Sequence, residues 1–135
     1  MKTTLALLIL LYFGETYSQE TIIESLSLRI CSTGSKKAEL DFNQGYLYYR
    51  EPFGLKLDLN PEFEEVYKKH LKNKYGIIYE NGNRIKVISD GIIDDFGKCY
   101  YETMKNLIIE KFGQDIFEIM MKEAKDIYYE KKYWA

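Results

Sequence analysis

The chain has 135 residues, of which 46% are hydrophobic and 30% are charged, and its formal net charge at pH 7 is −2. This length and composition fit one folded domain and exclude a largely disordered chain or a protein with several membrane spans. The near-neutral charge argues against nucleic-acid binding, which needs a clustered excess of Lys and Arg. The single His excludes most His-based metal sites. We predict no cofactor and no nucleic-acid partner.

The first residues have the pattern of a cleavable signal peptide. Lys2 precedes an uninterrupted apolar run over residues 5–13, and Thr16 and Ser18 place small residues at the −3 and −1 positions. This run is about half of the roughly 20 residues that a membrane-spanning helix needs, so a retained anchor is the weaker alternative. We expect an exported protein, periplasmic or secreted, with no membrane contact after cleavage. The predicted organisation is a signal peptide, 1–18, and a single globular domain, 19–135.

Export would place Cys31 and Cys99 in an oxidising environment. We predict a disulfide between them, which would stabilise the fold by about 4 kcal/mol in the chain-entropy model. The alternative is two buried free thiols, which behave as small apolar groups. The spacing of the two residues in the sequence does not decide between these states.

Alternation of apolar and polar residues predicts strands in the first half of the mature chain. It favours a strand over 24–31, although the apolar residues of segment 20–31 also fit one face of a helix. A loop is expected at 32–37, and alternation resumes over 38–42. Two β-rich runs, 46–50 and 55–59, flank a turn with Pro52 and Gly54 and predict a hairpin.

A helix is predicted from Pro61 to about Tyr75. Asn60 is a good N-cap, Pro61 suits the first helical position, and Gly76 is a natural residue after the helix end. The lysines near its end match the helix dipole and need no ligand to explain them. His70, the only imidazole, has no orienting carboxylate or nucleophile nearby in the sequence, so we predict no catalytic role for it.

Three further elements complete the prediction. A hairpin around residues 81–83 would pair Tyr79 with Ile85 and Ile77 with Val87. One helix is expected over about 95–112, capped by Asp94 or Asp95 and ended by Gly113, and another over about 115–130. The short connection favours antiparallel packing of these two helices. We predict an α+β fold, with an antiparallel sheet of about four to six strands, one inserted helix and a C-terminal antiparallel helix pair.

The sequence carries none of the common catalytic or metal-binding motifs, such as a glycine-rich phosphate loop, HExxH, CxxC or GxSxG. Asp90, Asp94 and Asp95 offer oxygen ligands, but turn formation and helix capping explain all three. Asp41 and Asp58 could act as an acid–base pair only if the fold joined them. We therefore predict neither a metal site nor a catalytic residue, and the sequence favours a protein without enzymatic activity.

Tyrosine is the unusual feature of the composition, with 13 Tyr beside 7 Phe and 1 Trp. Neighbouring tyrosines in a strand or helix point in different directions, so some rings must face solvent or a partner. Tyr and Trp are favoured in protein interfaces, although a tyrosine can also lie half-buried at a domain edge with its hydroxyl in water. The candidate binding residues are Tyr46, Tyr48, Tyr49, Tyr101, Tyr129, Tyr133 and Trp134.

These observations predict an exported, non-catalytic binding module that recognises a protein or a glycan through exposed aromatic residues. One alternative is a periplasmic inhibitor or immunity-type protein, suggested by small size, export and mild acidity. The second alternative is a small carboxylate-dependent hydrolase. The sequence does not identify the ligand or partner.

Overall fold

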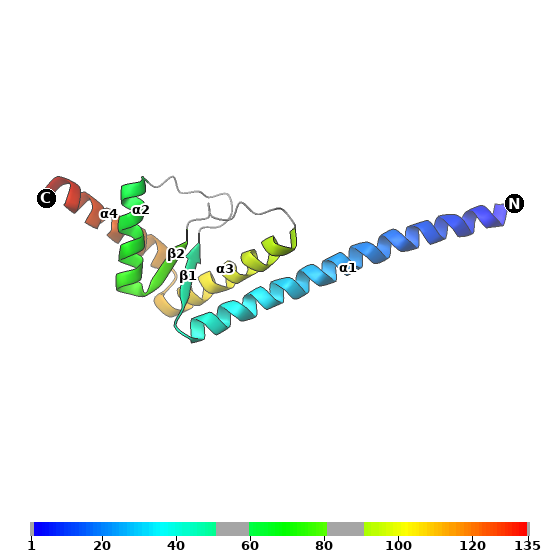
Figure 1. Ribbon diagram of the computed structural model, residues 1–135, viewed down its shortest axis with the longest axis horizontal. Helices are drawn as coiled ribbons and strands as arrows, with labels where there is room; N and C mark the ends of the chain where they lie inside the picture. The colour runs from blue at the N-terminus through cyan, green and yellow to red at the C-terminus, as the bar shows by residue number, and fades with distance from the viewer. Residues whose placement is uncertain (1, 51–59, 81–90, 135) are drawn as a thin grey trace.

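The computed structural model describes the backbone of residues 2–50, 60–80 and 91–134, and the side chains of 19, 21–50, 60–80 and 95–134. Figure 1 shows the two ends of the chain at opposite ends of the longest axis, with α3 beside the C-terminal half of α1 and α2 beside α4. None of the helices in these ranges is apolar over a stretch long enough to cross a membrane. The elements are α1 (Lys2–Asn43), β1 (Leu47–Arg50), α2 (Pro61–His70), the π-helical turn η1 (Leu71–Tyr75), β2 (Ile77–Glu80), α3 (Gly91–Phe112) and α4 (Ile116–Trp134).

The predicted antiparallel sheet of four to six strands is wrong. Over the described residues, β1 and β2 form a two-stranded parallel sheet in which Leu47 lies opposite Ile77. Parallel strands need a long crossover connection, and α2 with η1 lies in that connection. The sequence predicted β1 correctly, but the second strands of both expected hairpins fall in 51–59 and 81–90, outside the described residues.

Helix α1 replaces the strands predicted at 24–31 and 38–42 and the loop predicted at 32–37. The alternation over 24–31 implied one buried apolar face, but Leu26 and Leu28 are both exposed. The side of α1 that meets α3 carries small residues instead, at intervals of three or four: Ser27, Cys31, Gly34 and Ala38. This spacing is that of one helix face. The sequence did not reveal a helix here, because small residues are also typical of loops.

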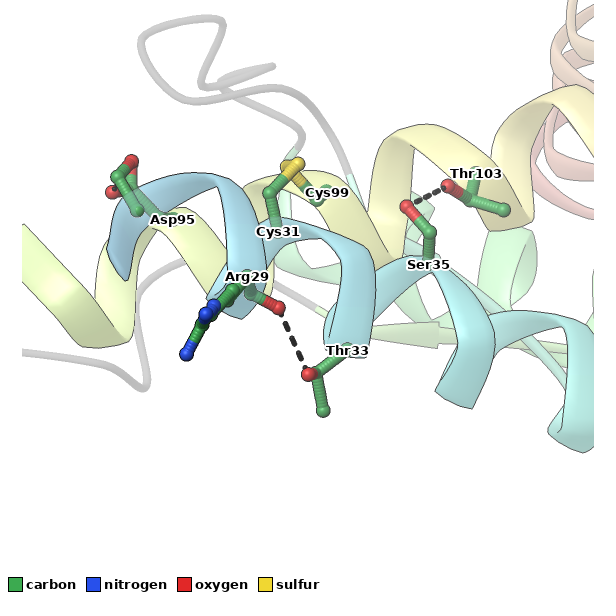
Figure 2. The surroundings of a disulfide bond; sticks show 8 residues. Arg29, Cys31, Thr33, Ser35, Asp95, Cys99 and Thr103 are labelled. Atoms are coloured by element: carbon green, nitrogen blue, oxygen red, sulfur yellow. Dashed lines mark hydrogen bonds between the residues drawn. A yellow bond between two sulfur atoms is a disulfide. The ribbon is translucent and has the colours of Figure 1, made fainter. Parts of the chain in front are cut away.

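Helices α1 and α3 run parallel and in one constant register, because three cross-links join residues that are each 68 positions apart. Figure 2 shows two of them, the disulfide between Cys31 and Cys99 and the hydrogen bond between Ser35 and Thr103. The structure brings Cys31 and Cys99 together in disulfide geometry, with the two Cα atoms 5.2 Å apart. The two hydrogen bonds measure 2.6 Å and 2.9 Å. The linked pairs are Ser27 with Asp95, Cys31 with Cys99, and Ser35 with Thr103.

Helix α2 begins and ends as its sequence predicts. Asn60 Oδ1 accepts a hydrogen bond of 3.1 Å from the Glu62 N–H, and Pro61 occupies the first turn. Gly76 adopts a left-handed conformation with φ of 69° and ends the helical segment. The last turn is π-helical, which widens the backbone at the junction with β2.

The two C-terminal helices form at nearly the predicted positions but do not pair with each other. Helix α3 begins at Gly91, so Asp94 and Asp95 lie within the helix and do not cap it. Gly113, with φ of 113°, separates α3 from α4. Helix α4 packs antiparallel to α2 instead, because its apolar stripe meets the buried side of that helix. The predicted C-terminal helix pair is therefore wrong.

One hydrophobic core joins all these elements. Tyr67, Leu71, Ile77, Met104, Ile108 and Met120 are its largest fully buried members within the described chain. Most of its buried residues come from α2, η1, α3 and α4, where they recur every four positions, which is the spacing of one helix face.

Candidate functional site

Three of the predicted aromatic residues lie together at the exposed C-terminal end of α4. The rings of Tyr129 and Tyr133 stack with their centroids 6.1 Å apart and their planes within 18°. The exposed fractions are 52% for Tyr129, 69% for Tyr133 and 89% for Trp134. Aromatic side chains of this size are costly to leave in water, so this end of the helix is the strongest candidate for a contact surface.

The aromatic residues near β1 have different surroundings. Tyr46 is exposed and stacks on the half-buried Tyr48, with ring centroids 6.5 Å apart. Tyr49 is buried, and its ring stacks on Phe117 at 4.3 Å. The structure therefore places Tyr46 at the surface and Tyr49 in the core.

Tyr101 is half-buried on α3 and takes part in an internal polar cluster. Its hydroxyl donates a hydrogen bond to Glu80, and the Arg50 guanidinium lies 5.4 Å from its ring centroid. Burial, followed by the hydrogen bond to the Glu80 carboxylate, raises the pKa of Tyr101. These contacts tie α3 to the sheet, so Tyr101 lies apart from the aromatic residues of α4.

An open groove of about 470 Å³ lies between β1 and the first turns of α4. The rings of Tyr49 and Phe117 and the side chain of Met121 supply its apolar surface. Three charged residues complete the lining: Glu118, Lys122 and Lys125. The sequence did not single out this groove, because it depends on β1 meeting α4 across more than sixty positions of the chain.

The groove and the stacked pair of Tyr129 and Tyr133 share one side of α4. Successive residues in a helix turn by about 100°, so positions 118, 122, 125, 129 and 133 fall on one face. The buried residues Ile116, Met120 and Ala124 form the opposite side. One exposed face of α4 therefore runs from the groove to Tyr129 and Tyr133, and we call it the outer face of α4.

A second polar cluster joins the end of α2 to α4. Glu123 accepts hydrogen bonds from Lys74 Nζ at 2.5 Å, from the Tyr75 hydroxyl at 2.8 Å and from His70 Nε2 at 2.7 Å. These donors, Lys74 first, lower the pKa of Glu123 to about 2, against the effect of burial. Burial and the bond to this carboxylate raise the pKa of Tyr75.

This cluster supplies the carboxylate that the sequence near His70 lacks, but it contains no Ser, Thr or Cys that could act as a nucleophile. The carboxylate comes from a helix 53 positions further along the chain, so no local pattern could have predicted the contact. The arrangement joins two helices and does not form a catalytic triad.

Asp41 is also engaged inside the fold. Its carboxylate accepts a hydrogen bond of 2.6 Å from Lys37 and one of 2.7 Å from the Tyr100 hydroxyl. The bond from Lys37 lowers the pKa of Asp41, while burial raises the pKa of Tyr100. Asp58 and Asp90 lie outside the described residues. Among the side chains that the structure describes, no group of three or more His, Cys, Asp or Glu is placed to hold a metal ion.

Comparison of the chain with protein-family models, with curated proteins and with solved structures found no match.

Proposed function

We propose that this chain is an exported, non-catalytic binding module that recognises a protein partner through the aromatic end of α4. The observation that carries the proposal is the exposure of Tyr129, Tyr133 and Trp134 at one helix end. The N-terminal pattern of residues 1–18 supports export.

Tyr and Trp are the residues that most often dominate binding energy in protein interfaces, because each offers a large contact area with few rotatable bonds. Tyr129 stacks on Tyr133, and this contact restricts the rotation of both rings before a partner binds. A surface ordered in this way loses less side-chain entropy on binding. A protein partner fits these features, and a glycan is the alternative that the test below separates.

The earlier alternatives gain no support from the described residues. The hydrolase needs two converging carboxylates, whereas Asp41 is bound by Lys37 and Tyr100. The inhibitor would present the acidic segment 90–95 as a protruding loop, whereas the chain is helical from Gly91.

Site-specific crosslinking tests the proposal. A photoreactive phenylalanine analogue replaces Tyr133 in the full chain, and the producing cells are irradiated before gel analysis and mass spectrometry. We expect a discrete crosslinked product that contains a second protein. The matched control carries the same analogue at Lys36, which is exposed on a different helix, α1.

Equal products from both positions, or none from Tyr133, would contradict the proposal. A product from Tyr133 that glycosidases remove and proteases leave intact would identify a glycan as the partner and would overturn the choice of a protein.

A further inference from the structure

The outer face of α4 also indicates the chemistry of the partner. We propose that it binds a protein segment that carries carboxylates beside an apolar side chain. This inference rests on the proposed function and adds a partner class to it.

The apolar side chain of the proposed partner segment would occupy the groove. The Tyr49 ring lies against the Phe117 ring. Together with Met121, these residues give the groove an apolar surface at the N-terminal end of α4. The groove volume, about 470 Å³, exceeds that of one large side chain and falls within the range of ligand sites. A buried Leu, Ile or Phe anchor would remove apolar surface of both molecules from water.

The charges around the groove favour carboxylates. Lys122 and Lys125 line it and are exposed, and neither forms an ion pair within the described chain. Lys105 of α3 adds a third cation, with its Nζ 5.7 Å from the centroid of the Phe117 ring. The single carboxylate in the lining is Glu118. The charge of this surface is positive although the chain as a whole is acidic, which indicates an acidic partner.

The same pattern continues along α4 toward its end. The Nζ atom of Lys132 lies 5.6 Å from the centroid of the Tyr128 ring. In the sequence, these two residues directly adjoin the stacked pair of Tyr129 and Tyr133. By the rotation of an α-helix, Glu130 lies about 100° around the helix from Tyr129, and Asp126 lies about 60° from Tyr129, on the side of Tyr133. Cations and aromatic rings therefore share the outer face of α4, while the carboxylates of the last turns lie toward its edge.

A peptide-display selection with the full chain as bait tests this inference. The library contains random twelve-residue peptides, and the readout is the charge and apolar content of the enriched sequences. We expect enrichment of Asp and Glu around a Leu, Ile or Phe. A synthetic peptide from the enriched set then gives dissociation constants by fluorescence anisotropy at low and high salt.

The variant Lys122→Glu/Lys125→Glu should weaken binding of this peptide by at least about tenfold, because two attractive contacts become repulsive. The control Lys36→Glu/Lys98→Glu makes the same change in net charge at exposed positions of α1 and α3, and it should leave the affinity nearly unchanged. Added salt should weaken the wild-type complex, because it screens surface charges.

The contrary outcomes separate the two proposals. Enriched peptides without acidic residues, whose binding is lost in Tyr133→Ala/Trp134→Ala, would overturn the acidic partner and leave the binding module standing. Absence of any peptide that depends on these aromatic residues, together with failure of the crosslinking, would overturn both. Equal loss in the two charge-reversed variants would show a general charge effect and contradict a site at the groove.

Discussion

Glu123 receives three hydrogen bonds from two turns of a neighbouring helical segment, so a single side chain links α4 to the end of α2. Lys74 lies in the last turn of that segment, where a cation also interacts favourably with the helix dipole. The ionised carboxylate is therefore stabilised in the folded state more than in the unfolded chain, and folding stability must depend on pH.

The sign of this dependence follows from the lowered pKa of Glu123, about 2 in place of 4.5. Above pH 4.5 the carboxylate is charged in both states and its contribution is complete, and it disappears as the pH falls toward 2. Glu123→Gln should lower the free energy of unfolding at pH 7 by about 1 kcal/mol, since partial exposure screens the pairs. Urea unfolding at pH 7, 4 and 2.5 should show this difference shrinking.

The control for this measurement is Glu110→Gln, an exposed position of α3 with no ion pair among the described residues. A difference between wild type and Glu123→Gln that stays constant over the whole pH range would contradict the assigned role of the carboxylate.

Helices α1 and α3 come unusually close at Gly34. A Cβ atom at this position would lie 2.4 Å from the carbonyl oxygen of Phe96 and 3.3 Å from the Tyr100 nitrogen. Both are backbone atoms, so the helices would have to separate to admit a methyl group. The small residues of α1 therefore set the distance between the two helices.

Gly34→Ala should destabilise the fold by about 1–3 kcal/mol through overpacking, although alanine favours helix formation. Gly97→Ala is the matched control on α3, because a Cβ there meets nothing within 4 Å. It should leave stability unchanged or raise it by up to about 1 kcal/mol. Thermal unfolding of both variants compares them directly. Equal midpoints would show that the close approach of α1 and α3 at Gly34 does not affect the stability of the fold.

Comparison of α1 with the other helices shows why the sequence predicted some helix ends and missed α1 itself. Asn60, Gly76 and Gly113 mark helix ends by local chemistry, and the structure confirms all three positions. The small residues of α1 become informative only once α3 lies against them, and the sequence alone does not show that contact. Segment 32–37 was predicted as a loop for this reason.

The disulfide acts on the molecule as a whole, because it closes a long loop between two cysteines that are 68 positions apart in the sequence. Cys31→Ala/Cys99→Ala should lower the free energy of unfolding by about 4 kcal/mol in the chain-entropy model. Denaturant titration with and without a reducing agent measures this effect. The reducing agent should lower the midpoint of the wild type and leave the double variant unaffected, and an unchanged wild type would contradict a disulfide in the purified protein.

At this scale the sequence correctly predicted exposed aromatic residues, whereas it did not predict the arrangement of the helices and strands. It identified Tyr129, Tyr133 and Trp134 because adjacent aromatic residues cannot all be buried, which is a local argument. It missed the groove and the cluster around Glu123, since both join segments that are distant in the sequence. Helix pairing and strand direction likewise depend on contacts that no local pattern specifies.

The constant register of α1 and α3 limits how the molecule can respond to a partner. Moving α3 along α1 by one turn would shift the two sulfur atoms by about 5.4 Å, so the closed disulfide prevents such sliding. The disulfide holds α1 and α3 in this register, so any adjustment of α4 to the proposed partner segment would come from rotation about the connection at Gly113 or from the packing of α4 on α2.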